Sequence, residues 1–413
     1  MFLTLFRKEC AQTAGSLIYW LYVACLVLFF NSQLGNMDIL SPPQQGQEDY
    51  AQYGYEQDVS EQDIMEAGTG NLIWAYYYDS YVTYPIGYAK NVSLSGEEKD
   101  EIGDMIYQLT GLKPDELEAD IAAYFEEHNI ETTPYKVTLK DGITYEAFLK
   151  CMDRTAKILG PGSDYTEDRL KANVRIPVDY EGAAANYRDL TEKDGLTGGY
   201  ARLFCDYMGI IAGILPIFVT ATRVLRDKRS RMQELLYVRG ASSGTMMASR
   251  YLALLCMHMA PILLLSLIPT VNCVQAGISG VSLDYAAWLK YDLGWLMPEV
   301  MTVISVGMIC TELTETALAV LVQTVWWFVS VMTGGSGMGG GAYGWHLIPR
   351  HNTELNYAGF AEGFRQLAVN RIFYVVLSLV LAALTAFIYE KKRKGHLRRG
   401  KKVSGNRKSS VQA

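Results

Sequence analysis

The stretch RVLRDKRSRMQELLYVRGASSGTMMASRYLALL, Arg223–Leu255, decides the fold of this chain. It links two apolar segments, and its seven bases face only the acids Asp227 and Glu234; the bases are Arg223, Arg226, Lys228, Arg229, Arg231, Arg239 and Arg250. Short loops rich in Lys and Arg remain on the cytoplasmic side of membrane proteins. The stretch therefore predicts a polytopic membrane protein in which this loop lies inside the cell.

The middle of this loop has helical periodicity. Met232, Leu235, Leu236 and Arg239 recur at the spacing of one helix face, so an amphipathic helix would present an apolar ridge to a partner. Gly240 is expected to end that helix, and Ser242 or Ser243 to cap the next one. Two interpretations stay open, a docking helix and a solvated loop that only orients the protein.

Composition and charge distribution agree with a membrane protein. The chain has 413 residues, of which 50% are hydrophobic, and a formal net charge of −7. Residues 34–200 carry 32 acids against 13 bases, whereas residues 391–413 carry ten bases and no acid. The acidic part is expected outside and the basic tail inside, against anionic lipid. This placement of the bases next to an apolar span excludes nucleic acid as the expected partner.

Six segments are apolar and long enough to cross a bilayer. They predict an all-α polytopic membrane protein with six transmembrane helices: 15–33, 203–222, 251–273, 293–310, 316–333 and 371–389. The first follows an amphipathic segment, 1–14, and is expected to be an uncleaved anchor, because no cleavage site follows it. The other expected segments are an extracytoplasmic domain at 34–200, a cytoplasmic loop at 223–250, a Gly-rich outer loop at 334–370 whose backbone can turn sharply or re-enter the membrane edge, and a cytoplasmic tail at 390–413.

The large domain between the first two spans is predicted to be mostly helical. Ser95 and Glu98 form a capping box that opens a helix closed by Gly111, and Pro114 opens another. Apolar spacing from Tyr145 predicts a third helix, which ends at Gly160. A tyrosine cluster in residues 76–88 fits core packing, a membrane-interface belt or ligand stacking.

The sequence contains no recognisable catalytic or cofactor-binding motif. Gly335, Gly337 and Gly340 satisfy GxGxxG, but they follow an apolar span instead of a strand. GxxxxGK[ST] does not occur, and His346 and His351 lack the spacing of a metal site. We therefore expect no enzyme activity, no bound metal and no cofactor in this chain, so that any ATP and Mg would bind to a partner ATPase. The scattered cysteines receive no role.

Ionisable residues within the apolar segments are Asp206, Asp292 and Glu299. A charge at membrane depth is costly and tends to be functional. Asp206 and Asp292 are expected near the outer interface. Glu299 is a candidate for lining a translocation path; the alternatives are that it pairs with an Arg or a backbone group, or lies closer to the surface.

Several stretches carry a family resemblance over nearly the whole chain: YPIGYAKNVSLSGEE, GGYARLFCDYMGIIAGILPIFVTATRVLRDKRSRMQELLYVRG, IPRHN and NRIFYVVLSLVLAALTAFIYEKKR. The chain resembles the permease subunit of a bacterial ABC transporter of the type-two exporter class. No single motif among these is as diagnostic as a nucleotide-binding sequence. The closest resemblance covers Tyr200–Leu255.

The resemblance implies roles for particular segments. Residues 1–12 are similar to the connector helix that lies along the inner membrane surface. Residues 227–239 are similar to the coupling helix that sits against the ATP-binding subunit, and residues 311–315 to a second inner turn. The expected coupling contacts are Met232, Glu234, Leu235, Leu236 and Arg239.

The resemblance also implies partners and a mechanism. Two permease copies or paralogues would pair in the plasma membrane, each with an ABC ATP-binding subunit, and export substrate by alternating access. Both termini would be cytoplasmic. Peptides, lipids and drugs remain open as substrates. The alternative function is a membrane-anchored receptor or sensor with an extracytoplasmic ligand-binding domain, and a membrane-embedded enzyme ranks last.

Overall fold

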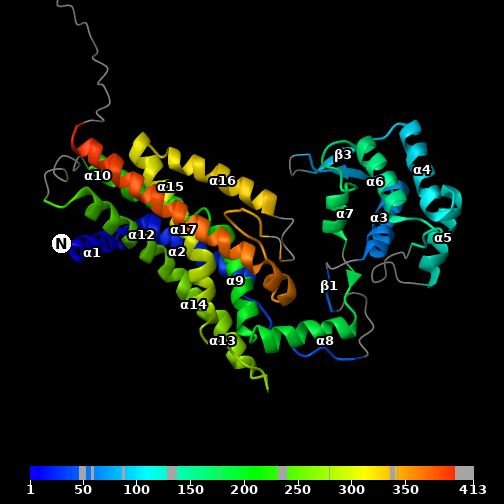
Figure 1. The fold of residues 1–413 in the computed structure, drawn as a ribbon, viewed down its shortest axis with the longest axis horizontal. Helices are drawn as coiled ribbons and strands as arrows, with labels where there is room; N and C mark the ends of the chain where they lie inside the picture. Colours follow the sequence, from blue (N-terminus) through cyan, green and yellow to red (C-terminus); the bar gives the residue numbers. More distant parts are fainter. Residues whose placement is uncertain are drawn as a thin grey trace, which may run out of the picture. The chain divides into compact units, whose positions relative to one another are not determined.

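The computed structural model describes residues 1–45, 53–56, 60–85, 89–127, 137–174, 176–230, 240–278, 280–334, 340–341 and 343–395. The chain divides into two compact units, one of residues 1–39 with 189–413 and one of residues 40–188. Each unit is described by itself. Helices dominate both units (Figure 1).

The first unit is a helical bundle. It begins with α1 (Phe2–Ala14) and α2 (Leu17–Leu34), and resumes after residue 188. The later elements are η1 (Asp189–Lys193), α9 (Thr197–Ala212), α10 (Pro216–Arg229), α12 (Ser243–Leu265), α13 (Leu267–Ala276), α14 (Ala287–Tyr291), η2 (Asp292–Leu296), α15 (Met297–Thr314), α16 (Leu318–Gly334) and α17 (Tyr357–Arg393).

Four helical stretches in the described residues are long and apolar enough to cross a membrane: Leu17–Leu34, Ser243–Ala276, Ala287–Thr314 and Tyr357–Arg393. The pair α9 and α10 makes a fifth if its bent halves form one span, and the 17-residue α16 is a shorter apolar helix. Each of the six predicted segments therefore contains an apolar helix, but only four or five of these helices have the length of a span. The fold is mostly helical, as expected.

The expected span from 203 to 222 is broken in the structure. α9 and α10 meet at 43° around Gly213, Ile214 and Leu215, before Pro216. A proline has no amide hydrogen to donate, so the ladder of helix hydrogen bonds is interrupted there. Two side chains of α16 bond to carbonyls at the break: Gln323 Nε2 lies 2.7 Å from the Gly213 oxygen and Trp327 Nε1 2.6 Å from the Ile210 oxygen.

Helix boundaries extend beyond the apolar segments. α10 continues through Asp227 to Arg229, and α12 begins at Ser243, so the expected 223–250 loop narrows to the residues between these helices. Ser242 caps α12 by accepting a hydrogen bond from the Thr245 amide, as predicted. α17 begins at Tyr357, well before the expected start of the sixth span at residue 371. The prediction followed apolar residues alone, but a helix can continue beyond an apolar stretch where its polar side chains find hydrogen-bond partners.

α15 lies at the centre of the bundle. It packs against α10, α12, α16 and α17. In the stretch Ala287–Thr314, which contains α15, 72% of an 18-residue apolar segment is buried, whereas the corresponding share in α17 is 22%. Contact with α17 uses small polar groups: Ser305 donates to the Ser378 carbonyl at 2.8 Å and Thr302 to the Tyr374 carbonyl at 3.3 Å. Such residues allow close approach of membrane helices. α17 leaves a broad apolar face exposed, which suits contact with lipid.

The second unit contains α3 (Glu61–Tyr77), α4 (Gly96–Thr110), α5 (Pro114–Glu127), α6 (Tyr145–Leu159), α7 (Glu167–Asn173) and α8 (Tyr180–Arg188). Two small antiparallel sheets accompany them, β1 (Tyr55–Glu56) with β4 (Ile176–Pro177) and β2 (Tyr81–Thr83) with β3 (Lys90–Val92). The core of this unit lies between α3, α4 and α6, around Ile73, Ile106 and Phe148.

The helix boundaries predicted in this unit are confirmed. Ser95 and Glu98 form the expected capping box, and Gly111 ends α4 at a positive φ of 78°. α5 begins at Pro114, and α6 runs from Tyr145 until Gly160 caps it. These helix ends could be predicted because capping depends on the residues immediately around each end.

Candidate functional site

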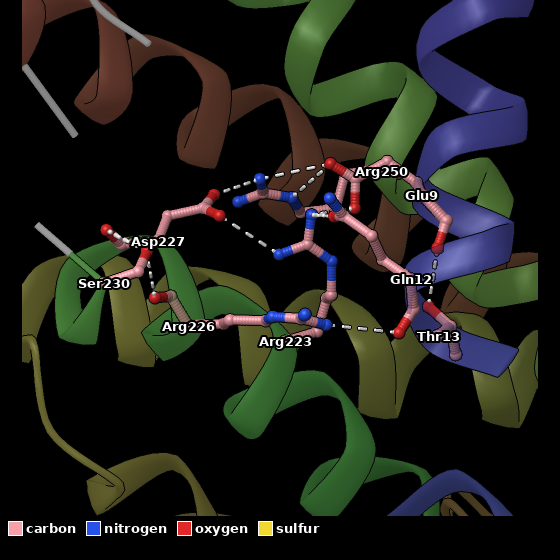
Figure 2. A network of polar contacts seen from close by, with 8 residues as sticks. All are labelled: Glu9, Gln12, Thr13, Arg223, Arg226, Asp227, Ser230 and Arg250. Carbon is pink, nitrogen blue, oxygen red and sulfur yellow. Dashed lines mark hydrogen bonds and ion pairs between the residues drawn. The ribbon is translucent and has the colours of Figure 1, made fainter. Parts of the chain in front are cut away.

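Four charged side chains at the ends of three helices form a closed ring of alternating charge. Arg223 of α10 lies 2.7 Å from Glu9 of α1 and 3.2 Å from Asp227 of α10. Arg250 of α12 lies 3.2 Å from Glu9 and 2.5 Å from Asp227. We call Glu9, Arg223, Asp227 and Arg250 the ion-pair ring (Figure 2). Each charge in it has two neighbours of opposite sign.

The ring is largely shielded from water. Arg223 and Arg250 are 6% and 4% exposed, and the Glu9 and Asp227 side chains 14% and 18%. Burial strengthens the attraction between opposite charges, and it also makes the loss of any one partner costly. The four residues are thus arranged to hold α1, α10 and α12 together.

Neutral groups around the ring attach α1 further. Arg223 donates a hydrogen bond to the side-chain oxygen of Gln12, and Arg226 donates to the Gln12 carbonyl at 3.4 Å (Figure 2). Ser230 donates back to the Arg226 carbonyl at 2.9 Å and so completes the last turn before the described part of α10 ends. The amphipathic segment predicted from residues 1–14 is therefore a helix fixed to this corner of the bundle.

The ring flanks the segment expected to be the coupling helix. Asp227 is the first residue of this segment, 227–239, and Arg250 follows the segment in sequence, so their ion pair joins its start to the helix that comes after it. The predicted contact residues themselves lie outside the described residues: Met232, Glu234, Leu235, Leu236 and Arg239. The structure therefore describes the ion pairs at the start of the segment and not residues 231–239, which include the expected contacts.

A second group of ion pairs lies at the ends of α15 and α17. Lys392 of α17 lies 3.3 Å from Glu312 and 3.1 Å from Glu315, which caps α15. Arg393 donates to the Ala241 carbonyl at 2.7 Å. We call Lys392, Glu312 and Glu315 the tail clasp. The start of the basic tail and the end of the basic loop therefore adjoin the same end of the bundle.

Glu299 lies in the middle of the bundle and is fully buried. Its nearest cation among the described residues is Arg371 of α17, with Nη1 3.9 Å from Oε2. Of the interpretations left open by the sequence, a distant pairing with an arginine is the one the structure shows. Glu299 is 0% exposed and therefore lies inside the helical bundle, while its depth in the membrane and a role in lining a path stay predictions.

Asp206 is also buried, and sequence reasoning missed its partners. Arg350 donates two hydrogen bonds to it, both 2.9 Å long, and the His351 amide a third. Four residues further towards the start of α9, Arg202 donates to Asp194 at 3.1 and 2.8 Å. Arg350 in the IPRHN stretch was the sequence feature that could have indicated this pair, since a buried arginine needs acceptors for its hydrogen bonds.

The fold and a comparison with known proteins identify the family of this chain. The fold defines a polytopic helical membrane protein in which buried ion pairs link the helices of the bundle. Residues 47–343 match the model of a family described as ABC-2 family transporter protein, which covers more than half of the chain. The chain belongs to this family and is an ABC transporter permease. Searches of curated proteins and of solved structures give no match.

Proposed function

We propose that this chain is the membrane-spanning subunit of an exporter, driven by a separate ABC ATPase that binds ATP and Mg. Family membership assigns a transport component, and permeases of this family work with an ATP-binding subunit. Membership also favours transport over the alternative of a receptor or sensor. The direction of transport, alternating access and pairing with a second permease copy belong to the proposal.

The ion-pair ring is the observation that carries the mechanism. The ring links the helices on both sides of residues 231–239 to each other and to α1. Glu9 of α1 lies 2.7 Å from Arg223, and Asp227 lies 2.5 Å from Arg250. We propose that the ATPase docks on Met232, Glu234, Leu235, Leu236 and Arg239. A push on this segment would then move α10 and α12 together, because their ends are tied by ion pairs.

The break between α9 and α10 gives this movement a hinge. We propose that rotation at Gly213 separates α9 from α15 and exposes Glu299 to a translocation path. Support comes from the position of the carboxylate, since a Cβ placed on Gly213 would lie 2.8 Å from Glu299 Oε1. Loss of the close packing at this point would therefore uncover the acid directly.

The topology in this proposal follows the charges. Residues 34–200 lie outside the plasma membrane, and both termini with the ion-pair ring and the tail clasp lie inside. The basic end of α17 contacts Ala241, the end of the basic loop just before α12, which suits this arrangement. Lipid would contact the exposed apolar face of α17.

The proposed function is tested by co-expressing the chain with a candidate ATPase and measuring complex formation and nucleotide turnover. Leu235→Asp with Leu236→Asp should abolish the complex, because charges replace the apolar ridge. Asp227→Asn should keep the complex but reduce stimulation of turnover. Arg229→Gln, outside the ring, is the matched control. Unchanged binding and turnover in the double variant would refute the docking site.

A further inference from the structure

The buried acids Asp206, Asp194 and Glu299 of the bundle differ in how far their oxygens find hydrogen-bond donors. Asp206 receives two hydrogen bonds of 2.9 Å from Arg350, and Asp194 receives bonds of 3.1 and 2.8 Å from Arg202. Neither oxygen of Glu299 accepts a hydrogen bond within the described part of the chain, although this side chain is 0% exposed. An ionised carboxylate left in this way is strongly destabilising, because it has lost its hydration and gained no hydrogen bond in return. The same bundle provides close arginine forks for the other two acids and none for Glu299.

Arg371 does not fill this role. Its guanidinium donates to the carbonyls of Trp295 at 3.0 Å and Leu347 at 2.9 Å, and to the Asn370 side chain at 2.9 and 2.6 Å. These neutral oxygens satisfy the guanidinium, and Nη1 remains 3.9 Å from Glu299. The positive charge is thus fixed in place by other acceptors, too far to hydrogen-bond to the acid.

The Glu299 carboxyl group is directed at the backbone of the broken helix. A Cβ on Gly213 would lie 2.8 Å from Oε1, and one on Gly209 3.4 Å from Oε2. One helical turn earlier on α9, Cys205 Sγ lies 3.7 Å from Asp292 Oδ1. We call Cys205, Gly209, Gly213, Asp292 and Glu299 the α9–α15 seam. Its two acids face a row of small residues.

Around Glu299, acceptors outnumber donors. Gln323 of α16 uses its amide nitrogen to bond the Gly213 carbonyl at 2.7 Å, while its own side-chain oxygen finds no donor among the described residues. Glu299 and Gln323 therefore both leave buried side-chain oxygens without a donor among the described residues. A proton on Glu299 would turn one acceptor into a donor and remove the buried charge.

Few other titratable or charged groups face Glu299. Those in electrostatic contact with it are Arg371 and Tyr374 of α17 and Cys205 of α9. α16 contributes the neutral Gln323, and the segment before α17 contributes Ile348 beside Gly213. α10 and α12 meet α15 further along, near Gly307 and Ser305. Only Arg371 carries a fixed charge among these groups.

We propose that Glu299 is a proton-binding site, which carries a proton in the conformation described here and releases it when α9 and α15 separate. On opening, the proton would pass from the carboxyl group to water that enters the seam, and the carboxylate would take up one proton on closing. Release of the proton on opening, and its coupling to transport, rest on the proposed function, whereas protonation of Glu299 in the conformation described here does not.

The test uses infrared spectroscopy of the full chain in lipid bilayers, without substrate or ATPase. We expect a carbonyl stretching band of a protonated carboxyl group that disappears in Glu299→Gln. Glu312→Gln is the control, because this acid lies on the same helix but pairs with Lys392 at 3.3 Å. That variant should keep the band. Asp292→Asn separates any contribution of the second acid of the seam.

Thermal stability gives an independent measurement. Glutamine has the shape of a protonated glutamate, so Glu299→Gln should fold with an unchanged or higher Tm at neutral pH. A carboxyl band that is identical in wild type and Glu299→Gln would overturn the proposal. Failure of Glu299→Gln to fold, or a clear fall in Tm, would also overturn it, because such a loss indicates an ionised pair with Arg371. Neither result depends on whether an ATPase binds this chain.

Discussion

Asp227 and Arg250 are 23 positions apart in sequence, yet their carboxylate oxygen and guanidinium nitrogen lie 2.5 Å apart. This ion pair closes the connection between α10 and α12 at its base, and Glu9 joins both helices to α1. The proposed transmission of force through this loop requires such a rigid base, because flexible flanks would absorb the movement.

Arg250→Met should lower the free energy of unfolding by about 1–3 kcal/mol, less than for a fully buried pair because Asp227 is partly exposed. The loss leaves two acids opposite Arg223 alone. Thermal unfolding in detergent measures it. Lys290→Met breaks an exposed pair with Asp284 and should cost under about 1 kcal/mol. Equal losses in the two variants would show that burial of the ring adds nothing.

Glu9→Gln should release α1 from the bundle without unfolding it. Arg223 and Arg250 both lose a counter-charge, at 2.7 and 3.2 Å, while the helix keeps its own backbone hydrogen bonds. Amide hydrogen exchange should become faster in residues 2–14 and remain unchanged in α15. Arg7→Gln, which leaves the ring intact, should not alter exchange in α1.

Gly213→Ala should destabilise the bundle by about 1–3 kcal/mol, the usual cost of overpacking a core. The new methyl group would meet Glu299 Oε1 and Ile348 Cδ1, each at 2.8 Å. Gly294→Ala is the matched control, because a Cβ there meets nothing within 4 Å. Denaturation of both variants in detergent distinguishes the two sites. Equal stability would mean that the helix break adjusts freely.

Lys392→Met should loosen the end of α17. Both acids of the tail clasp lose their cation, and Glu312 is 7% exposed, so water replaces the lost contact poorly. We expect faster proteolysis after residue 390 and a lower Tm. Lys391→Met changes a lysine whose recorded contact is the ring of Phe387 and should have little effect. Similar proteolysis of the two variants would contradict the clasp.

Acid should weaken the second unit through Glu101 and Arg154. The hydrogen bond from Arg154, 2.5 Å long, lowers the pKa of Glu101, which joins α4 to α6. A lowered folded-state pKa gives stability that is present above the unfolded value, about 4.3, and lost as pH falls through the folded value. Arg154→Gln should therefore reduce the loss of Tm between about pH 5 and pH 3.

The control for this pH effect is Lys150→Gln, which removes an exposed pair with Glu146 within one helix. Its acid profile should follow that of the wild type. An Arg154→Gln profile parallel to the wild type would show that the α4–α6 pair does not contribute to acid sensitivity.

Local signals in the sequence determined a large part of the fold. Apolar length gave the positions of the helices, and the capping residues Ser95, Gly111 and Ser242 gave several ends, because both depend on neighbours within one or two turns. The concentration of bases between Arg223 and Arg250 marked the loop that the ion-pair ring now supports. Family resemblance pointed to an ABC transporter permease, and the family match confirms this.

Only the tertiary structure decided which charges meet. Glu9 lies 214 positions before Arg223, and Asp206 lies 144 before Arg350, so no local pattern identifies either pair. The length of the apolar segment 203–222 could not show the break at Gly213 either, since a straight helix and a bent one can have apolar segments of the same length. The pairing of distant acids and bases is fixed by how the helices pack. That same packing leaves Glu299 buried without a close counter-charge, a property that no stretch of sequence contains by itself.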